Sequence, residues 1–242
     1  MKTKQNRIPA LVLCAAMLLT LCACRTSGLS TEDASKCVQV EMDATYKGQF
    51  DGFVDFYDNV TTDDARDQYN SKIEYEADYF MDMYGVPDPA DTSVIVEPSE
   101  LQAKRSRDLY KDIYAKADYS IASSSKQDDG TYAVKVTVRP LDIIKLVDDN
   151  FDAAFEAFWT KFDAVDTESM SDDEFTSWYT NTFAGEYYDT LLDLLEEQIP
   201  NIGYSDEKNI VIQVQQSEDG SLFISNEDFS NLDWLIIDYN VD

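Results

Sequence analysis

Residues 128–147 read DDGTYAVKVTVRPLDIIKLV and contain the clearest structural signal in the chain. Every second residue from Tyr132 to Val138 is a large β-forming residue, which is the period-two pattern of a strand with one buried face. Asp129-Gly130 predicts a two-residue hairpin turn before this strand. Pro140 suits the first turn of a helix that would follow the strand directly.

A second hairpin is expected near the C-terminus. Ile210, Ile212 and Val214 alternate in the same way, and Asp219-Gly220 again suggests a turn. Two hairpins supply four strands, which most simply form one antiparallel sheet. We therefore predict an α+β fold that is mostly helical, with the four-stranded sheet covered by helices.

The intervening segments show helical spacing of apolar residues. We expect a helix over 31–47 ended by Gly48, and another that starts within Thr61-Thr62-Asp63-Asp64 and ends at Gly85 as its C-cap. Ser99 with Gln102, and Ser171 with Glu174, resemble capping boxes. The helix after Ser99 should bury Leu101, and the helix after Pro140 should bury Trp159.

We expect residues 31–242 to form a single acidic domain. Each hairpin follows a pair of helices and leads into another helix, so the domain could consist of two related αββα-type halves joined near residues 163–172. Residue identity between these halves is low, so an undivided domain remains the alternative.

The N-terminus has the three parts of a secretory signal peptide. Lys2, Lys4 and Arg7 precede an apolar run that is shorter than the roughly 20 residues needed to span a bilayer. Leu21-Cys22-Ala23-Cys24 then resembles a lipobox. We predict a signal peptide over 1–23, lipidation with fatty acid such as palmitate at Cys24, and a lipidated tether over 24–30. An uncleaved membrane anchor is the alternative, and either places the domain on the extracellular face of the cell membrane.

Charge and residue content exclude several function classes. Removal of residues 1–23 would leave 219 residues with a net charge of −32, which argues against nucleic-acid binding and permits a cationic or protein partner. The chain contains no histidine, which excludes Ser-His-Asp and Cys-His catalysis and His-ligated zinc. Cys37 is the only cysteine after Cys24, and its helical neighbours predict a small buried hydrophobe.

Some candidate sites remain, and each has an ordinary structural explanation. Acidic pairs recur along the chain and could serve a carboxylate-based hydrolase, but none stands out among 48 acidic residues. Asp88, Asp91 and Glu97 share a loop that could bind calcium loosely. Tyrosines on the helix after Thr62 could form a carbohydrate or peptide platform. We assign no catalytic, metal or cofactor-binding residue, and lipidation of Cys24 is the only site prediction.

Basic residues concentrate after Ser99, at Lys104, Arg105, Arg107, Lys111 and Lys116. On so acidic a chain, we expect them to balance the charge of neighbouring helices. A strip that faces lipid or binds an anion is the alternative.

Several motifs resemble uncharacterised lipoproteins of anaerobic Gram-positive bacteria that share a domain of unknown function. The residues that carry the resemblance are EMDATYKGQF at 41–50, IEYEADYF at 73–80, LYKDIY at 109–114 and VRPLDII at 138–144. The resemblance covers most of the chain after the signal peptide. It implies a lipoprotein with one domain, and it implies no activity.

These observations favour a membrane-anchored surface lipoprotein that acts as a non-enzymatic binding or envelope-associated module of unknown ligand. The alternatives are a solute-binding subunit of a transporter and a carboxylate-based hydrolase. Repeated βα units would favour the transporter subunit, and two facing carboxylates in a cleft would favour the hydrolase.

Replacement of the predicted lipidation residue gives a direct test. We expect Cys24→Ala to abolish acylation and to leave unprocessed precursor, because no thiol remains at the lipobox position. Metabolic labelling with a fatty-acid probe measures this, with Cys22→Ala as the matched control that should keep its label. Label retained in Cys24→Ala would contradict the lipobox assignment.

Overall fold

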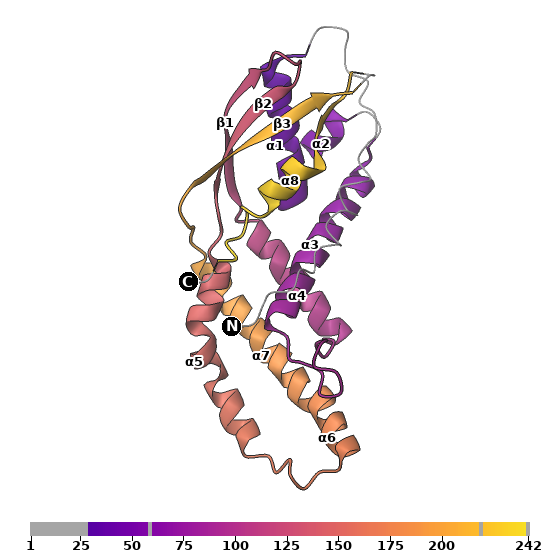
Figure 1. Cartoon of the computed structure of the whole chain (residues 1–242), viewed down its shortest axis with the longest axis vertical. Coiled ribbons are helices and arrows are strands. Elements are labelled where there is room, and N and C mark those ends of the chain that lie inside the picture. The colour runs from indigo at the N-terminus through magenta and orange to yellow at the C-terminus, as the bar shows by residue number, and fades with distance from the viewer. Residues whose placement is uncertain (1–28, 58–59, 218–219, 241–242) are drawn as a thin grey trace. The chain divides into compact units, whose positions relative to one another are not determined.

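The computed structural model describes residues 29–57, 60–217 and 220–240 (Figure 1). In chain order, its elements are α1 (Thr31–Lys47), α2 (Asp51–Phe56), α3 (Thr62–Tyr84), α4 (Glu100–Tyr114), β1 (Asp118–Lys126), β2 (Tyr132–Arg139), α5 (Ile143–Asp163), α6 (Asp172–Trp178), the π-helix η2 (Tyr179–Phe183), α7 (Ala184–Gln198), the 3-10 helix η3 (Ile199–Asn201), β3 (Lys208–Gln216), β4 (Leu222–Ile224) and α8 (Asn226–Asp233).

The predicted α+β fold is confirmed. The four strands form one sheet in the order β1-β2-β3-β4, and every neighbouring pair is antiparallel. Helices account for most of the remaining elements, and the two hairpins lie next to each other because β2 pairs with β3.

The chain divides into two compact units that interleave along the sequence. Unit 1 contains the described residues up to Lys72, together with Ala117–Pro140 and Asp206–Ile236. Unit 2 contains Ile73–Lys116, Leu141–Ser205 and the residues from Ile237 onward. A single domain over 31–242 and an origin from two αββα-type halves both remain predictions.

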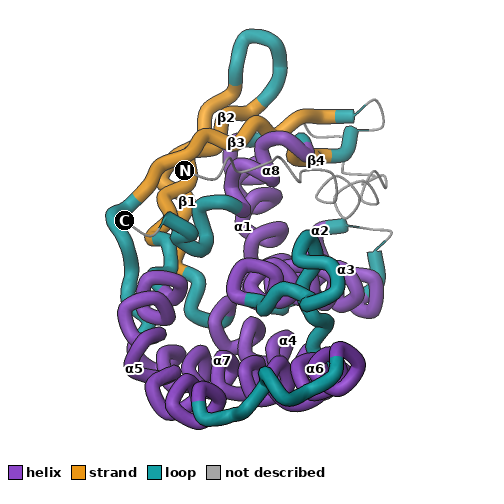
Figure 2. Tube along the Cα trace, turned by 60° about the horizontal axis from the view of Figure 1, so that its bottom comes forward, coloured by secondary structure: helices purple, strands orange, loops and turns teal. Residues whose placement is uncertain are grey.

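Unit 1 is built on a sheet with one buried face. Val134 and Val136 are fully buried, whereas Lys135 between them is exposed. Helix α1 packs across this face, and α8 lies against β3 (Figure 2). Cys37 on α1 is also fully buried, as its helical neighbours predict. The alternation read from the sequence therefore identifies the core face of the sheet correctly.

The first hairpin turn is longer than predicted. The N–H of Gln127 donates to the carbonyl of Thr131 at 2.8 Å, which leaves Asp128, Asp129 and Gly130 as a three-residue loop, so the two-residue turn at Asp129-Gly130 is wrong. The N–H of Gly130 donates to the carbonyl of Gln127 at 3.1 Å, and Gly130 then adopts a φ of 91°. A tight turn followed by a left-handed glycine is the common three-residue solution, which Asp-Gly also permits. Asp219 of the second turn lies outside the described residues.

Unit 2 is a helical layer in which α5 and α7 pack side by side and α4 lies against α7. The expected charge balance with neighbouring helices is confirmed for Arg105 and Arg107, whereas Lys104 and Lys111 pair with Asp108 of α4 itself. Arg105 contacts Asp193 and Glu196 of α7 at 2.7 and 2.5 Å. Arg107 contacts Glu74 of α3 at 2.6 Å within the same unit.

Both capping boxes are confirmed. The side chains of Ser99 and Ser171 accept a hydrogen bond from the backbone N–H three residues later. In turn, the side chains of Gln102 and Glu174 accept a hydrogen bond from the backbone N–H of the serine. Helix α1 also begins with such a box, at Ser30 and Asp33. Each box satisfies backbone donors that the first helical turn leaves without a partner.

Four local predictions need correction. Leu101 is 76% exposed and Trp159 is 39% exposed, so neither is a core residue. Pro140 precedes α5 rather than starting it, because Leu141 is held in β-bridges to Tyr204 and Ile237. Gly85 follows α3 without a left-handed φ. A Cβ there would meet the carbonyl oxygen of Met81 at 2.6 Å, so lack of space explains the glycine.

The N-terminal predictions fall on residues that the structure does not describe. The signal peptide over 1–23, the lipidation of Cys24 and most of the tether over 24–30 therefore remain predictions. Within the described ranges, no helix has the length and apolar content that crossing a bilayer requires.

The burial of the sheet predicts the effect of two neighbouring substitutions. We expect Val136→Asp to lower the free energy of unfolding by several kcal/mol, because Val136 is fully buried and a carboxylate there would have no partner. Lys135→Glu, on the exposed face of the same strand, should change it by less than about 1 kcal/mol. Urea denaturation monitored by circular dichroism measures both. A similar decrease in the free energy of unfolding in both variants would contradict a sheet with one buried and one exposed face.

Candidate functional site

The acidic pairs lie on separate elements. Asp63-Asp64 and Asp172-Asp173 occupy the first turns of α3 and α6, where negative charge favours the helix dipole. The others lie in the β1–β2 turn, on α5 and on α7 at Asp128-Asp129, Asp148-Asp149 and Glu196-Glu197. Across the described ranges, no three Asp, Glu or Cys side chains come together in a group able to hold a metal ion.

The candidate calcium loop uses its carboxylates internally. Asp88 accepts hydrogen bonds from the backbone N–H groups of Ala90 and Asp91 at 2.7 and 3.3 Å. Asp91 accepts from the backbone and hydroxyl of Ser93 at 3.0 and 2.7 Å. These bonds fix the loop without an ion, so the geometry adds no support for calcium binding.

A hydrogen-bonded network in unit 1 joins Glu41, Tyr57 and Cys37 beneath the sheet. The Tyr57 hydroxyl donates to Glu41 Oε1 at 2.6 Å and lies 3.4 Å from the Cys37 Sγ. Burial raises the pKa of Glu41 to about 7, and the bond from Tyr57 opposes part of that rise. Glu41 thus resembles a general acid in its protonation, but its hydrogen-bond partners are the buried Tyr57 and, through it, the fully buried Cys37, which is the pattern of a structural network.

A second network in unit 1 contains a nearly buried ion pair. Lys72 Nζ lies 3.3 Å from Asp233 Oδ1, and both side chains are about nine-tenths buried. The same carboxylate oxygen accepts from the Tyr46 hydroxyl at 2.6 Å. The extra hydrogen bond helps offset the cost of removing the charges from water, so the pair links α1, α3 and α8 within unit 1.

Unit 2 contains a comparable contact at the C-terminal segment. The Tyr239 hydroxyl donates to the buried carboxylate of Glu76, and the Tyr79 and Tyr239 rings meet edge to face at 5.2 Å. Burial first, and the neighbouring Tyr110 and Glu76 next, raise the pKa of Tyr239 far above its ordinary value. The tyrosine stays neutral and acts as a hydrogen-bond donor.

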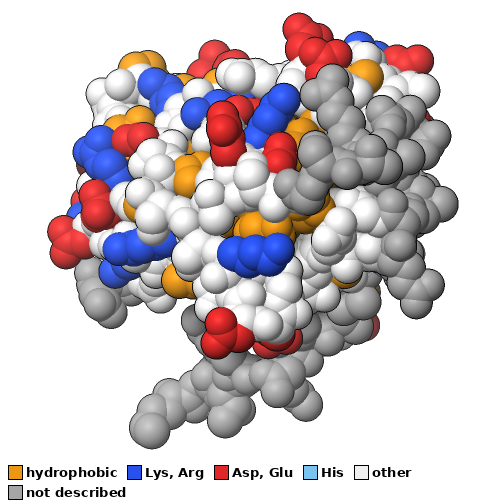
Figure 3. Space-filling view, turned by 90° about the horizontal axis from the view of Figure 1, so that it is seen from above, with side chains coloured by type: hydrophobic (Ala, Val, Ile, Leu, Met, Phe, Trp, Pro, Cys, Tyr) orange, Lys and Arg blue, Asp and Glu red, His pale blue; other side chains and the backbone are white. Residues whose placement is uncertain are grey.

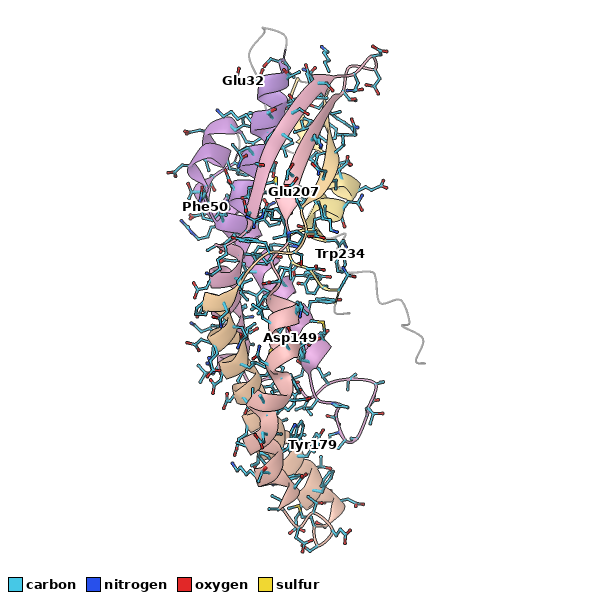
Figure 4. All side chains as sticks on the ribbon, turned by 90° about the vertical axis from the view of Figure 1, so that its left-hand side faces the viewer. Glu32, Phe50, Asp149, Tyr179, Glu207 and Trp234 are labelled. Carbon is cyan, nitrogen blue, oxygen red and sulfur yellow. The ribbon has the colours of Figure 1, made fainter. Side chains whose placement is uncertain are left out.

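The most accessible cluster in unit 2 is aromatic. We call it the ring surface: Trp159 and Phe162 of α5, Phe175 and Trp178 of α6, and Tyr179 and Phe183 of η2. The Trp178 ring lies 5.9, 6.0 and 5.8 Å from the rings of Phe162, Phe175 and Phe183. Tyr179 stacks on Phe183 at 4.9 Å. The rings therefore form one continuous group, and Figure 4 labels one of its members, Tyr179.

The ring surface is only partly covered: Phe162 is buried, whereas the other five rings are partly exposed. No residue of α6 or η2 is fully buried, although most of the rings they carry touch one another. Trp159 is 39% exposed and reaches Phe183 at 6.3 Å. Burial first, and the charge of Asp88 next, raise the pKa of Tyr179. By contrast, the face seen in Figure 3 has interspersed charges and only small separate groups of hydrophobic side chains.

This surface is not predicted from the sequence, because the spacing of the aromatic residues is interpreted as that of a regular α-helix. The π-helix η2 inserts a wider turn between α6 and α7, which resets which side chains share a face. Read as one regular α-helix, residues 172–198 would place Phe175, Trp178, Tyr179 and Phe183 on one face, as in a core helix. Their exposure depends on whether another element covers them, which local sequence does not encode.

The Glu41 network predicts a pH dependence. An unfolded glutamate titrates near its ordinary pKa of 4.5, whereas folded Glu41 holds its proton up to about pH 7. The folded state binds more protons in this window, so the free energy of unfolding should fall as pH rises through it, on the order of 1–3 kcal/mol. Glu41→Gln should flatten this part of the profile, measured by urea denaturation at several pH values.

Tyr57→Phe is the matched control, because it removes the donor that favours ionised Glu41. It should raise the pKa of folded Glu41 further, so the fall in stability with pH should extend to higher pH and become larger in total. A Glu41→Gln profile as steep as that of the wild type would contradict the assignment of the titration to Glu41.

Comparison with known proteins adds information on the fold. No protein-family model matches the chain, and no curated protein does. The structure is similar to a crystal structure of ycdA from Bacillus subtilis subsp. subtilis str. 168, which is named as a lipoprotein, with a TM-score of 0.50 and 17% identity. The match covers 85% of this chain and 56% of that one, so the chain spans a little over half the length of its structural neighbour. At this identity, the likeness shows a shared fold.

Proposed function

We propose that this protein is a membrane-anchored surface lipoprotein that acts as a non-enzymatic binding or envelope-associated module. The lipobox-like Leu21-Cys22-Ala23-Cys24 supports the anchor. The name of the structural neighbour, a lipoprotein, agrees with it. In this proposal the membrane is reached through lipid on Cys24, and the acidic domain lies on the extracellular face.

The partly covered ring surface is the observation that favours binding. Tryptophan and tyrosine rings provide large contact areas at a small cost in side-chain entropy, and they are enriched where proteins meet partners. The two carboxyls with a raised pKa, Glu41 in unit 1 and Asp78 in unit 2, lie on different helices and in different units, so they do not form the facing pair that a carboxylate hydrolase uses. The geometry therefore supports recognition better than acid–base chemistry.

The two alternatives have less support. A transporter's solute-binding subunit would typically contain repeated parallel βα units, whereas this sheet is antiparallel throughout. A carboxylate-based hydrolase would require two acids facing one accessible site. The five acidic pairs of the sequence lie on five different elements, and no contact between them in the described part of the chain supports such a site.

Surface labelling of intact cells tests the proposed location. In a Gram-positive host, we expect an amine reagent that does not cross membranes to label the wild-type protein, because exposed lysines such as Lys104 and Lys145 would face outward. Detergent-phase partitioning should recover the protein with lipids. A cytoplasmic protein is the internal control, and labelling that appears only after lysis would contradict the proposal.

A further inference from the structure

We propose that the ring surface of unit 2 is the docking site for a positively charged amphipathic segment of a partner protein. The inference rests on the proposed function as a binding module and names the surface and the partner chemistry. Three features carry it: rings that lack full cover, acidic side chains beside them, and a ring face that already accepts a cation.

The first feature is the incomplete burial of a whole segment. Residues 172–183 carry four aromatic rings, yet no side chain of α6 or η2 is fully buried. A segment so rich in aromatic residues ordinarily hides one face. A partner that packs on the rings would remove their remaining area from water, and the π-helix η2 is a distortion of the kind often found at functional sites.

The second feature is the charge beside the rings. Glu156 and Asp163 lie three and four residues from Trp159 on α5, so all three share one side of that helix. Asp172 lies one turn before Phe175 on α6, and Asp173 is next to it. All four carboxylates are exposed. They would repel an anionic partner and attract lysine or arginine.

Basic residues are scarce in the segment that carries most of the rings. Lys161 is the only lysine or arginine between Asp148 and Glu174, and its ammonium already pairs with Glu186. The acidic residues beside the rings therefore outnumber the basic residues in this segment, which gives it a net negative charge. This favours a cationic segment over an anionic lipid headgroup, which the same acids would repel.

The third feature is that one ring of this surface, that of Phe162, already accepts a cation. The Lys161 ammonium lies 5.0 Å from the centroid of the Phe162 ring, in a cation–π contact. Tryptophan binds cations better than phenylalanine does, and Trp159 and Trp178 belong to the same ring surface. A partner segment with lysine or arginine beside apolar residues would match both the rings and the acids, whereas a neutral sugar would leave the acids unused.

A binding experiment with the full lipidated chain tests this. The chain is held in nanodiscs of zwitterionic phosphatidylcholine, with empty nanodiscs as the blank. The probe is a short fluorescent peptide with lysine and leucine at amphipathic helical spacing, measured by anisotropy. We expect saturable binding that weakens as sodium chloride is raised, because screening reduces the attraction of the acids. The same peptide with glutamate in place of lysine should not bind.

Variants then locate the site. Trp159→Ala should weaken binding about tenfold, as expected for an aromatic residue at an interface. Trp234→Ala is the matched control, because Trp234 is 48% exposed but belongs to unit 1, and it should have little effect. Asp172→Asn with Asp173→Asn should weaken binding and reduce its salt dependence. Glu32→Gln with Glu227→Gln, which changes exposed first-turn acids of α1 and α8, should leave binding unchanged.

Circular dichroism and melting temperature confirm that each variant is folded, and the acid variants test the surface without altering a ring. Equal losses of peptide affinity in Trp159→Ala and Trp234→Ala would overturn the proposal. So would absent peptide binding, salt-independent binding of a neutral oligosaccharide, or preference for anionic vesicles. If the chain is labelled on intact cells but the peptide does not bind, the ligand assignment fails while the proposed surface function stands.

Discussion

The burial of one face of the antiparallel sheet is the constraint on which unit 1 depends. Strand β2 pairs with neighbours on both sides, so its side chains must point alternately toward α1 and toward solvent. A shift of one residue in its register would place Lys135 in the core and Val136 in water. The positions of α1, α8 and the neighbouring strands follow from keeping that face covered.

Burial also determines where this acidic chain tolerates polar groups in its interior. Asp233 accepts from Tyr46 and pairs with Lys72, so its charge is shared by two partners. Glu41 has a phenol donor and no basic partner within its network, and burial raises its pKa to about 7. The difference follows from chemistry: a buried carboxylate keeps its charge beside an ammonium and tends to hold a proton beside neutral donors.

Charge is managed differently on the surface of unit 2. Basic residues of α4 face acids of α3 and α7, so Arg105 and Arg107 neutralise charge between helices. The end of α5 and the start of α6 contain many acidic residues, but Lys161 is the only basic residue in this part of the sequence. The ring surface lies in this negatively charged part of the unit. Aromatic area and uncompensated charge thus coincide where the packing of unit 2 leaves rings half covered.

The sequence determined the elements that local chemistry controls. Period-two alternation identified β2 and its buried face, helical spacing identified α1, and serine capping boxes located the starts of α4 and α6. These signals are reliable because each depends on residues within one or two turns of one another.

Only the tertiary structure decided the features that depend on distant partners. The exposure of Trp159 and Leu101, the crowding at Gly85 and the interleaved units all depend on which segments meet in space. No local sequence pattern predicts the hydrogen bond between Glu41 and Tyr57 or the π-helix within the ring surface. A residue's spacing shows which face it shares, whereas its burial and pKa depend on what the rest of the chain places against that face.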